Sequence, residues 1–312
     1  MNPEEKKVLL AVDGSRQSLN TVDYASRLLP SDRTEVVLFN VLSRVPEFFD
    51  DLGKLPKHGR TIEKGWETAI SDSINQFMSD AARIFMGRGF PQEALTIKVE
   101  SKKEGVARDI ISESYRGYDV VLMGRNGFNM QQEPILGSIA GKLIEKISHE
   151  SLCVVGANPE TQSILLALDA SERSMLAVEF VGEMLSGSDV QLTLFHAIRG
   201  PSTFQQRFRK IFNLTFEDEW IETGLYEMKP LLREYKNRLV RAGFDPRCIT
   251  TKINTKVSNR SVAIVEEAVK GGYGTIVVGR RGLSAVEAFF MGRVGRKVLQ
   301  LAKEQAVWVV SK

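Results

Sequence analysis

The chain has 312 residues, of which 43% are apolar and 26% are charged, and its net charge is +3. This composition is ordinary for a globular protein and excludes collagen-like and largely disordered chains, while the length suggests about two domains. Two cysteines are too few for a disulfide scaffold. No apolar run approaches the roughly 18 to 20 residues of a membrane span, and the N-terminal segment lacks a signal-peptide core. We therefore expect a cytoplasmic protein without a transmembrane segment, and the small net charge does not favour nucleic acid as a partner.

Short apolar segments alternate with longer helical segments in the first half of the chain. Runs rich in Val, Ile and Leu predict buried strands at 7–12, 35–41, 95–100, 119–123 and 152–156. The clearest helix is 62–86, in which apolar residues recur every three or four positions. Apolar strands that alternate with helices predict a parallel sheet covered on both faces. Such a doubly wound α/β domain binds its ligands at the carboxyl ends of the strands.

The second half repeats these segments in the same order. VLLAVDGS at 8–15 recurs as ILLALDAS at 164–171, and DVVLMGRNG at 119–127 recurs as GTIVVGRRG at 274–282. An offset of 155 or 156 residues is far longer than the roughly 20 to 50 residues of a solenoid repeat, so it predicts a duplicated domain. We place the two domains at 1–158 and 159–312, because the polar stretch around Pro159 suits a linker.

The ends of the helices and strands carry further signals. The counterpart of the long helix is 217–241, where Pro230 predicts either a kink or the start of a new helix. Gly89 and Gly243 follow the two long helices, at positions where a left-handed terminating residue is expected. Each half ends in an apolar strand, at 152–156 and 306–310. Since an unpaired apolar edge favours aggregation, mutual pairing of these two strands would be a natural remedy.

A glycine pattern occurs at the same place in both halves. Gly124-x-x-Gly127 follows an apolar strand and precedes Gly137-Ser138 by nine residues, and the second half keeps the same spacing from Gly279 to Gly292. Glycines permit a tight turn and close backbone approach, and the start of a helix offers unpaired amides and a positive dipole end to a phosphate. Glycines that serve only turns and helix caps are the alternative interpretation. Two copies with identical spacing make that alternative much less favourable.

The strand ending in Asp-Gly-Ser, followed by the Gly-x2-Gly-x9-Gly-Ser pattern, closely resembles the universal stress protein family, and the resemblance covers both halves. It implies an α/β fold of two doubly wound, Rossmann-like domains (similar to adenine nucleotide alpha hydrolases) duplicated in tandem. Because the family pairs its subunits through the last strand, the resemblance also implies that 152–156 and 306–310 pair antiparallel in an intramolecular pseudo-dimer. It also implies a role in stress resistance and an adenine nucleotide as ligand, which is ATP or else AMP or ADP. In the nucleotide-binding branch of the family, the aspartate lies near the ribose and phosphates, the second strand offers backbone groups to adenine, and the glycines wrap the ribose and polyphosphate. Carried over by position, the contacts are Asp13, Val41, Met123, Gly124, Gly127, Gly137 and Ser138.

No separate metal site is expected, although Asp13 could help to hold Mg²⁺ through the nucleotide. The corresponding candidates in the second half are Asp169, Ala197, Gly279, Gly282, Gly292 and Arg293. Arg293 departs from the family pattern, which has Ser or Thr there. It either pairs with a phosphate, since a guanidinium matches phosphate oxygens well, or fills the phosphate niche with its bulk. We favour the second interpretation, because the helix start relies on close backbone approach, and so expect the nucleotide mainly in the first half.

Catalytic signals are weak. The three histidines His58, His149 and His196 are widely separated, and no spacing of histidine or cysteine predicts a metal. No general base, water-positioning residue and charge-stabilising residue occur together, so we expect at most weak ATP hydrolysis. His196 ends a strand beside the second candidate site and could touch a ligand, but a structural histidine is the favoured interpretation.

Residues 199–216 interleave arginines with phenylalanines. Such a segment could dock a protein partner, an anionic lipid surface or nucleic acid, although a loop that packs its phenylalanines on the domain is favoured. The leading functional hypothesis is an adenine-nucleotide-binding stress or signalling protein in which ligand occupancy alters shape or partner choice. The alternatives are a slow ATP-hydrolysing or nucleotide-transferring enzyme, and a nucleotide-free scaffold that acts through 199–216. Further pairing of the chain into a homodimer is left open.

Overall fold

The computed structural model of the chain describes residues 5–42, 57–126, 136–159, 162–200, 216–280 and 291–311. The elements of the first half alternate in type, as the sequence predicts. They are β1 (Lys6–Ala11), α1 (Arg16–Leu28), β2 (Thr34–Leu42), α2 (Lys57–Gly87), a short 3₁₀ turn (Gln92–Ala94), β3 (Leu95–Ser101), α3 (Val106–Ser114), β4 (Val120–Gly124), α4 (Ser138–Lys146) and β5 (Ser151–Val155).

The second half repeats this order. Its elements are β6 (Ser163–Ala167), α5 (Glu172–Leu185), β7 (Gln191–Arg199), α7 (Phe216–Arg241), a 3₁₀ turn (Pro246–Cys248), β8 (Ile249–Val257), α8 (Arg260–Lys270), β9 (Thr275–Gly279), α9 (Arg293–Leu301) and β10 (Ala306–Val310). The predicted strands and long helices are therefore present, with boundaries that differ by a few residues. The division of the chain between residues 158 and 159 stays a prediction.

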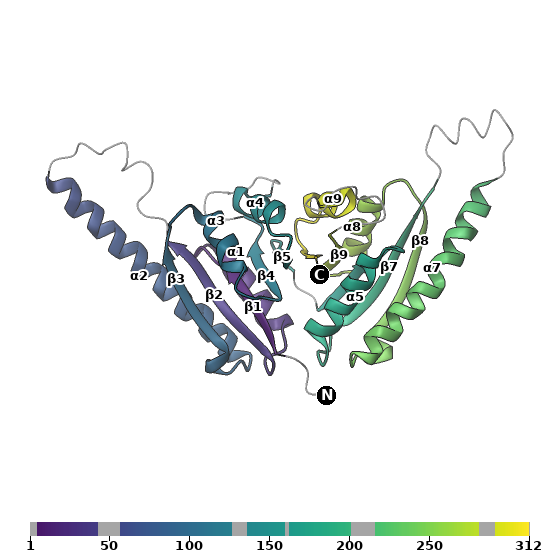
Figure 1. Cartoon of the computed structure of the whole chain (residues 1–312), viewed down its shortest axis with the longest axis horizontal. Coiled ribbons are helices and arrows are strands. Elements are labelled where there is room, and N and C mark those ends of the chain that lie inside the picture. The colour runs from purple at the N-terminus through teal and green to yellow at the C-terminus, as the bar shows by residue number, and fades with distance from the viewer. Residues whose placement is uncertain are drawn as a thin grey trace, which may run out of the picture.

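The ten strands form one sheet in the order β3-β2-β1-β4-β5-β10-β9-β6-β7-β8 (Figure 1). Neighbouring strands within each half are parallel, whereas β5 and β10 pair antiparallel at the centre, with Val154 opposite Val307 and Cys153 opposite Trp308. The expected pairing of the two terminal strands is therefore confirmed. The last strand of each half pairs with the last strand of the other, so neither β5 nor β10 is left as an exposed apolar edge.

Helices cover both faces of the sheet, and each face has a hydrophobic core that continues from one half into the other. One core contains buried residues of α1, α2, α5 and α7, and the other contains buried residues of α3, α4, α8 and α9. Alternation along β1 explains this division, because Val8 and Leu10 belong to the first core and Leu9 and Ala11 to the second. The carboxyl ends of β2 in the first half and β7 in the second half both point toward the upper part of Figure 1.

Local signals end the long helices where the sequence predicts. Gly89 and Gly243 adopt positive φ angles of 92° and 107°, the left-handed conformation expected after a helix. In contrast, α7 continues through Pro230, so no new helix begins there. The residue one turn earlier, Tyr226, is 80% exposed. The carbonyl that loses its helical donor to Pro230 therefore lies on a solvent-facing stretch, where water can replace the bond.

Buried polar contacts hold the halves together across the central strands. The Tyr24 hydroxyl accepts a hydrogen bond of 2.7 Å from the Trp308 indole and lies 2.9 Å from the Thr275 hydroxyl. The symmetry-related position of Tyr24 is Phe180, which packs edge-on against the same indole ring. The two halves are thus complementary at their junction rather than identical. Among the described residues, none of the helices is long and apolar enough to cross a bilayer.

Candidate functional site

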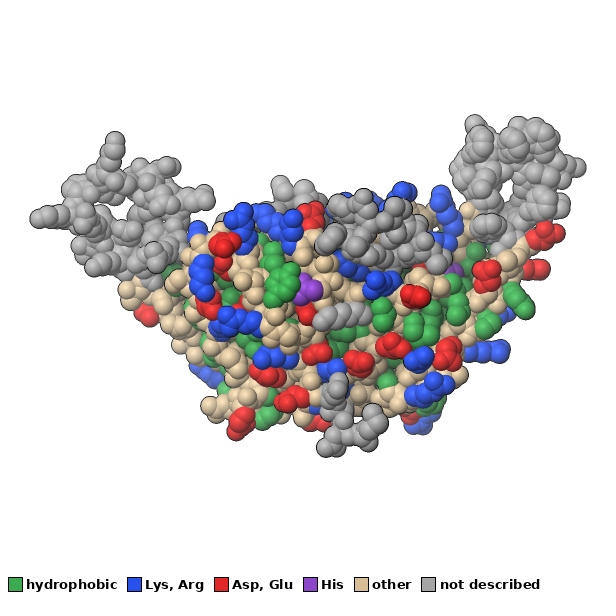
Figure 2. Space-filling view, in the orientation of Figure 1, with side chains coloured by type: hydrophobic (Ala, Val, Ile, Leu, Met, Phe, Trp, Pro, Cys, Tyr) green, Lys and Arg blue, Asp and Glu red, His purple; other side chains and the backbone are tan. Residues whose placement is uncertain are grey.

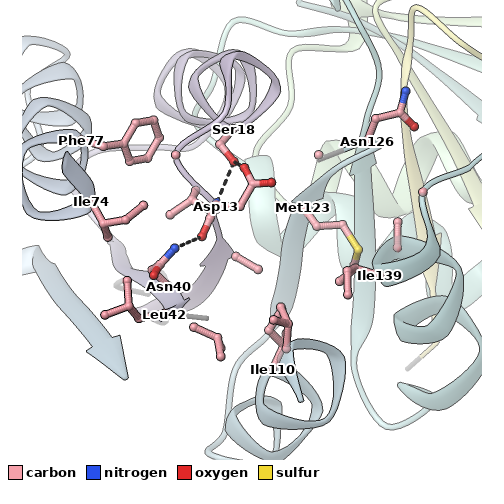
Figure 3. Close-up of a pocket in the computed structure, with 18 of the residues that line it drawn as sticks. Asp13, Ser18, Asn40, Leu42, Ile74, Phe77, Ile110, Met123, Asn126 and Ile139 are labelled. Atoms are coloured by element: carbon pink, nitrogen blue, oxygen red, sulfur yellow. Dashed lines mark hydrogen bonds between the residues drawn. The ribbon is translucent and has the colours of Figure 1, made fainter. Parts of the chain in front are cut away.

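A cavity of about 660 Å³ opens at the carboxyl edge of the sheet in the first half (Figure 3). The ends of β1, β2 and β4 and residues of α2, α3 and α4 line it. Every candidate of the first half that the structure describes lines this one cavity: Asp13, Val41, Met123, Gly124, Gly137 and Ser138. Gly127, the remaining candidate, lies outside the described residues. Positions spread over 126 residues of sequence are therefore brought together at one strand edge, as a doubly wound sheet requires.

Asp13 is held at the end of β1 by the start of the following helix. Its Oδ1 accepts hydrogen bonds from the Ser15 amide (3.0 Å) and the Ser18 hydroxyl (2.6 Å), and its own amide donates to the Ser18 hydroxyl oxygen (2.9 Å). Gly14 has a φ of 83°, which turns the chain sharply between the aspartate and α1. The carboxylate is thereby fixed in one orientation beside the cavity (Figure 3).

Two helices supply apolar walls. On one side α2 contributes Ile70, Ile74 and Phe77, and on the other side α3 contributes Val106 and Ile110. Figure 3 shows Ile74 and Phe77 facing the strand ends from one direction and Ile110 from the other. Apolar walls with a few fixed polar groups are typical of small-molecule sites, and they suit a flat, weakly polar ring better than a charged group.

The start of α4 forms the polar end of the cavity. The N-cap residue is Gly137, and no side chain caps this helix. Its first helical bond joins the Gly141 amide to the Gly137 carbonyl, so the amides of residues 138–140 have no acceptor within the helix. Ser138 is exposed at this first turn. Donors of this kind, at the positive end of a helix dipole, suit an anion such as phosphate.

Close packing explains why glycine occupies two of these positions. A Cβ at Gly137 would lie 3.0 Å from the Arg125 carbonyl oxygen, to which the Gly137 amide donates, and a Cβ at Gly124 would lie 2.7 Å from Cγ of Gln17. The Arg125 guanidinium does not reach the cavity, because it donates to the carbonyls of Leu299, Gln300 and Ala302 in the other half. The Arg125 guanidinium is therefore engaged with α9 and not with the start of α4.

Exposed basic residues lie on α3, on α4 and in the loop that precedes α3. Lys103, Arg108 and Lys142 are exposed, and Figure 2 shows Lys and Arg side chains gathered along the upper edge over α3 and α4. None of the three is among the described residues that line the cavity, and Lys103 forms an ion pair with Glu100 (2.8 Å).

Sequence reasoning missed Asn40, which lies on the floor of the cavity between β2 and β1. This side chain is 4% exposed, and its Nδ2 donates to the Val12 carbonyl (2.8 Å; Figure 3). In the part of the chain that the structure describes, its Oδ1 has no hydrogen-bond partner. A polar residue inside the apolar strand 34–42 was the available signal. The role of the amide, which fastens the end of β2 to the end of β1, depends on how the strands are placed beside each other.

The second half places its candidates on equivalent elements. Asp169 accepts from the Ser171 amide (3.0 Å) and the Ser174 hydroxyl (2.9 Å), as Asp13 does from its own serines. Ala197 lies near the end of β7, Gly279 ends β9, Gly292 caps α9, and Arg293 is its exposed first residue. Gly282 lies outside the described residues.

His196 occupies the position of Asn40, and its Nδ1 lies 2.7 Å from the Leu168 carbonyl oxygen. Burial lowers the pKa of this imidazole, so the neutral form, with Nδ1 as donor, is favoured. This contact supports the interpretation of His196 as a structural histidine, which stays a prediction.

Other reactive groups do not gather around the cavity. Within the described ranges, no three His, Cys, Asp or Glu side chains are placed to hold a metal ion. His149 contacts the buried Ser114 hydroxyl (3.1 Å) and stacks on Tyr115, away from the cavity residues. Cys153 is buried in β5, and burial raises the pKa of its thiol. His58 lies in α2 and its side chain is not described, and residues 201–215 of the basic aromatic segment lie outside the described residues.

Comparisons with known proteins agree with this architecture. The model of the universal stress protein family matches residues 5–154 and again residues 160–311. A universal stress protein of Mycolicibacterium smegmatis (strain ATCC 700084 / mc(2)155) is 24% identical over 311 residues, which cover 96% of this chain and 95% of that protein.

Solved structures show the same fold over the full length. The crystal structure of a universal stress protein from Archaeoglobus fulgidus DSM 4304 superposes with a TM-score of 0.56 at 17% identity, covering 97% of both chains. A functionally unknown protein from Pseudomonas aeruginosa PAO1 superposes with a TM-score of 0.53 at 14% identity, covering 98% of this chain and 92% of that one. At these identities the likeness shows the fold alone.

Proposed function

The chain belongs to the universal stress protein family, and from this membership and the geometry of the cavity we propose that its first half binds an adenine nucleotide as part of a stress or signalling response. The observation that carries the proposal is the cavity itself. It joins apolar walls on α2 and α3 to the uncapped, exposed start of α4. A nucleotide has the same two parts, a flat base and an anionic tail.

We propose a separate place in the cavity for each part of the ligand. The base lies between the helix walls, and the backbone near Val41 contacts its polar edge. The phosphates lie at the amides of residues 138–140, and the Ser138 hydroxyl adds one donor. Asp13 lies between these two regions, where a ribose would be. Since backbone groups and a helix start contact most of the ligand, we expect modest discrimination among AMP, ADP and ATP.

Magnesium fits this arrangement only through the nucleotide. Asp13 is the one carboxylate among the described residues that line the cavity, and two hydrogen bonds already fix its Oδ1. When bound, Mg²⁺ would neutralise phosphate charge. A single carboxylate provides fewer ligands than an all-protein Mg²⁺ site needs. The role of Asp13 is therefore to orient the Mg²⁺-bound phosphates.

Binding is favoured over turnover. The described lining residues include no histidine, glutamate or lysine that could activate water, and the Arg125 guanidinium is engaged with α9.

A slow ATPase or nucleotide-transferring enzyme remains the alternative. A nucleotide-free scaffold is the second alternative, in which residues 199–216 would dock a protein partner whether or not the cavity is filled. We place the protein in the cytoplasm, and its further pairing into a homodimer is part of the same proposal.

The first experiment asks whether nucleotide is present at all. Protein purified without added nucleotide is denatured, and the released ligands are separated and quantified, followed by calorimetric titration of ligand-free protein with ATP, ADP, AMP and GTP. We expect adenine nucleotides to bind with similar affinities and GTP to bind more weakly. Tight binding of GTP without binding of ATP would contradict the assignment of the base site, and no binding of any nucleotide would favour the scaffold.

The second experiment locates the phosphate. Ser138→Ala should weaken ATP binding by about 1.5 to 3 kcal/mol, since it removes one hydrogen bond to a charged group. Ser138→Arg should weaken it further, because the side chain obstructs the helix start. Gly87→Ala is the matched control, since a Cβ at Gly87 contacts nothing within 4 Å. Release of inorganic phosphate, measured in parallel, separates an ATPase from a binder.

A further inference from the structure

The helix α8 begins with an arginine, whereas α3, its counterpart in the first half, begins with a valine. Both helices follow a capping residue, Gly105 for α3 and Asn259 for α8, so Val106 and Arg260 occupy equivalent places. Val106 lines the cavity of the first half. Arg260 instead directs its guanidinium at the end of β7, where its Nε donates to the Ala197 carbonyl (3.3 Å).

Ala197 is the counterpart of Val41, the residue whose backbone groups face the base in the proposed nucleotide site. In each strand a phenylalanine lies two residues earlier and pairs with the last residue of the neighbouring strand. Phe39 of β2 pairs with Ala11 of β1, and Phe195 of β7 pairs with Ala167 of β6. The Arg260 contact therefore falls on the polar edge that a base would need. A backbone carbonyl that already accepts from a guanidinium is a poorer acceptor for an incoming ligand.

The backbone at this edge also differs between the halves. In the first half the pairing of β2 with β3 is regular from Val36 to Leu42. In the second half the register of β7 with β8 shifts between Ala197 and Arg199, and Lys256 adopts a φ of 61°, which is unusual for a residue other than glycine. Gly200 approaches Lys256 so closely that a Cβ on the glycine would lie 3.2 Å from the lysine Cα. The strand end is thus remodelled beside the carbonyl that Arg260 contacts.

We infer that the second half excludes the nucleotide at both ends of its candidate site, with Arg260 closing the base edge at Ala197 and Arg293 filling the helix start, so that each chain holds a single nucleotide. This inference rests on the proposed function of the first half. It adds to the substitution at Arg293 a second, independent obstruction on a different element. Restoring Arg293 to serine alone therefore leaves the base edge closed.

The test is the molar ratio of bound ATP, measured by calorimetry and by equilibrium dialysis. We expect no second ATP in the wild type, in Arg293→Ser or in Arg260→Val, and one additional ATP per chain in Arg260→Val/Arg293→Ser. Arg241→Val, which removes an exposed arginine at the end of α7, is the matched control and should leave the ratio unchanged. Thermal unfolding of each variant establishes that the fold is retained, which the exposure of both arginines favours.

Blocking the first site isolates the second half. In the Ser138→Arg background, the natural second half should bind ATP at least tenfold more weakly than the wild-type chain does, and Arg260→Val/Arg293→Ser should restore one site. ATP bound by the natural second half with wild-type affinity would overturn the inference, as would a double variant that gains no ATP. If the wild type binds no ATP but the double variant binds one, the proposed function of the first half fails while the inference about Arg260 and Arg293 stands.

Discussion

Each half of the chain inserts an arginine into the other half, and this reciprocal contact makes a sharp prediction about stability. Arg125 is 5% exposed, and its guanidinium donates to the carbonyls of Leu299 (2.6 Å), Ala302 (3.0 Å) and Gln300 (3.2 Å) at the end of α9. Arg280 is 3% exposed and donates in the same way to the carbonyls of Ile147 and Ile144 at the end of α4. A cation at a helix C-terminus supplies donors to carbonyls that the helix cannot satisfy. We therefore choose Arg125→Met, which keeps an unbranched apolar stem and removes the donors.

The size of the effect follows from these contacts. Hydrogen bonds that involve a charged group contribute about 1.5 to 3 kcal/mol each, and their contributions are not simply additive. Removing the cation also recovers part of the cost of burying it, and that cost is visible in the lowered pKa of Arg125, which burial causes. We expect a net loss of about 3 kcal/mol in the free energy of unfolding, at the upper end of what single substitutions cost. With an unfolding entropy of about 2.1 cal/mol/K per residue, this loss lowers Tm by about 5 °C if the halves unfold together.

The assay is urea unfolding, followed by circular dichroism, with differential scanning calorimetry in parallel. Arg108→Met, at an exposed position of α3, is the matched control and should change the free energy of unfolding by less than about 0.5 kcal/mol. Because Arg125 and Arg280 act on one junction, the double variant should lose less than the two single losses added together. Equal stability of Arg125→Met and Arg108→Met would refute the argument that these arginines cap helices across the junction.

Two further predictions concern buried groups. Tyr24→Phe leaves the Trp308 indole N–H without its acceptor, so we expect a loss of about 1 to 3 kcal/mol in urea unfolding. In a Trp308→Phe background, which removes the donor, Tyr24→Phe should cost less, and an equal cost in both backgrounds would show that packing, rather than the unpaired donor, sets it. His196 has a folded-state pKa below the ordinary 6.5 because it is buried, so the unfolded chain binds more protons in that range and stability should fall as the pH drops through about 6.5. His196→Asn, which copies Asn40, should flatten this part of the stability profile, and parallel profiles for the two proteins would contradict the assignment.

The sequence by itself determined the elements, the duplication and most of the candidate site. Strands and helices differ in the spacing of their apolar residues, and spacing is a local property. The strand at 119–123 and the helix at 62–86 can therefore be predicted from the sequence alone. The positions of Gly124, Gly137 and Ser138 followed from a repeated pattern together with a family resemblance. The antiparallel pairing of β5 with β10 followed from the family resemblance, together with the open edges that two apolar terminal strands would otherwise leave.

Only the tertiary structure decided what the arginines and Asn40 do. Arg125 and Arg280 lie inside the glycine pattern and, from sequence, could equally have faced a phosphate, yet each donates to a helix more than 130 residues away along the chain. Arg260 likewise begins an ordinary amphipathic helix, and its effect on Ala197 depends on how α8 is placed against β7. Local patterns constrain φ and ψ and the buried face of each element, whereas the direction of a long side chain is set by carbonyls that packing brings within reach. The two halves therefore differ in side chains whose contacts depend on residues that are distant in the sequence.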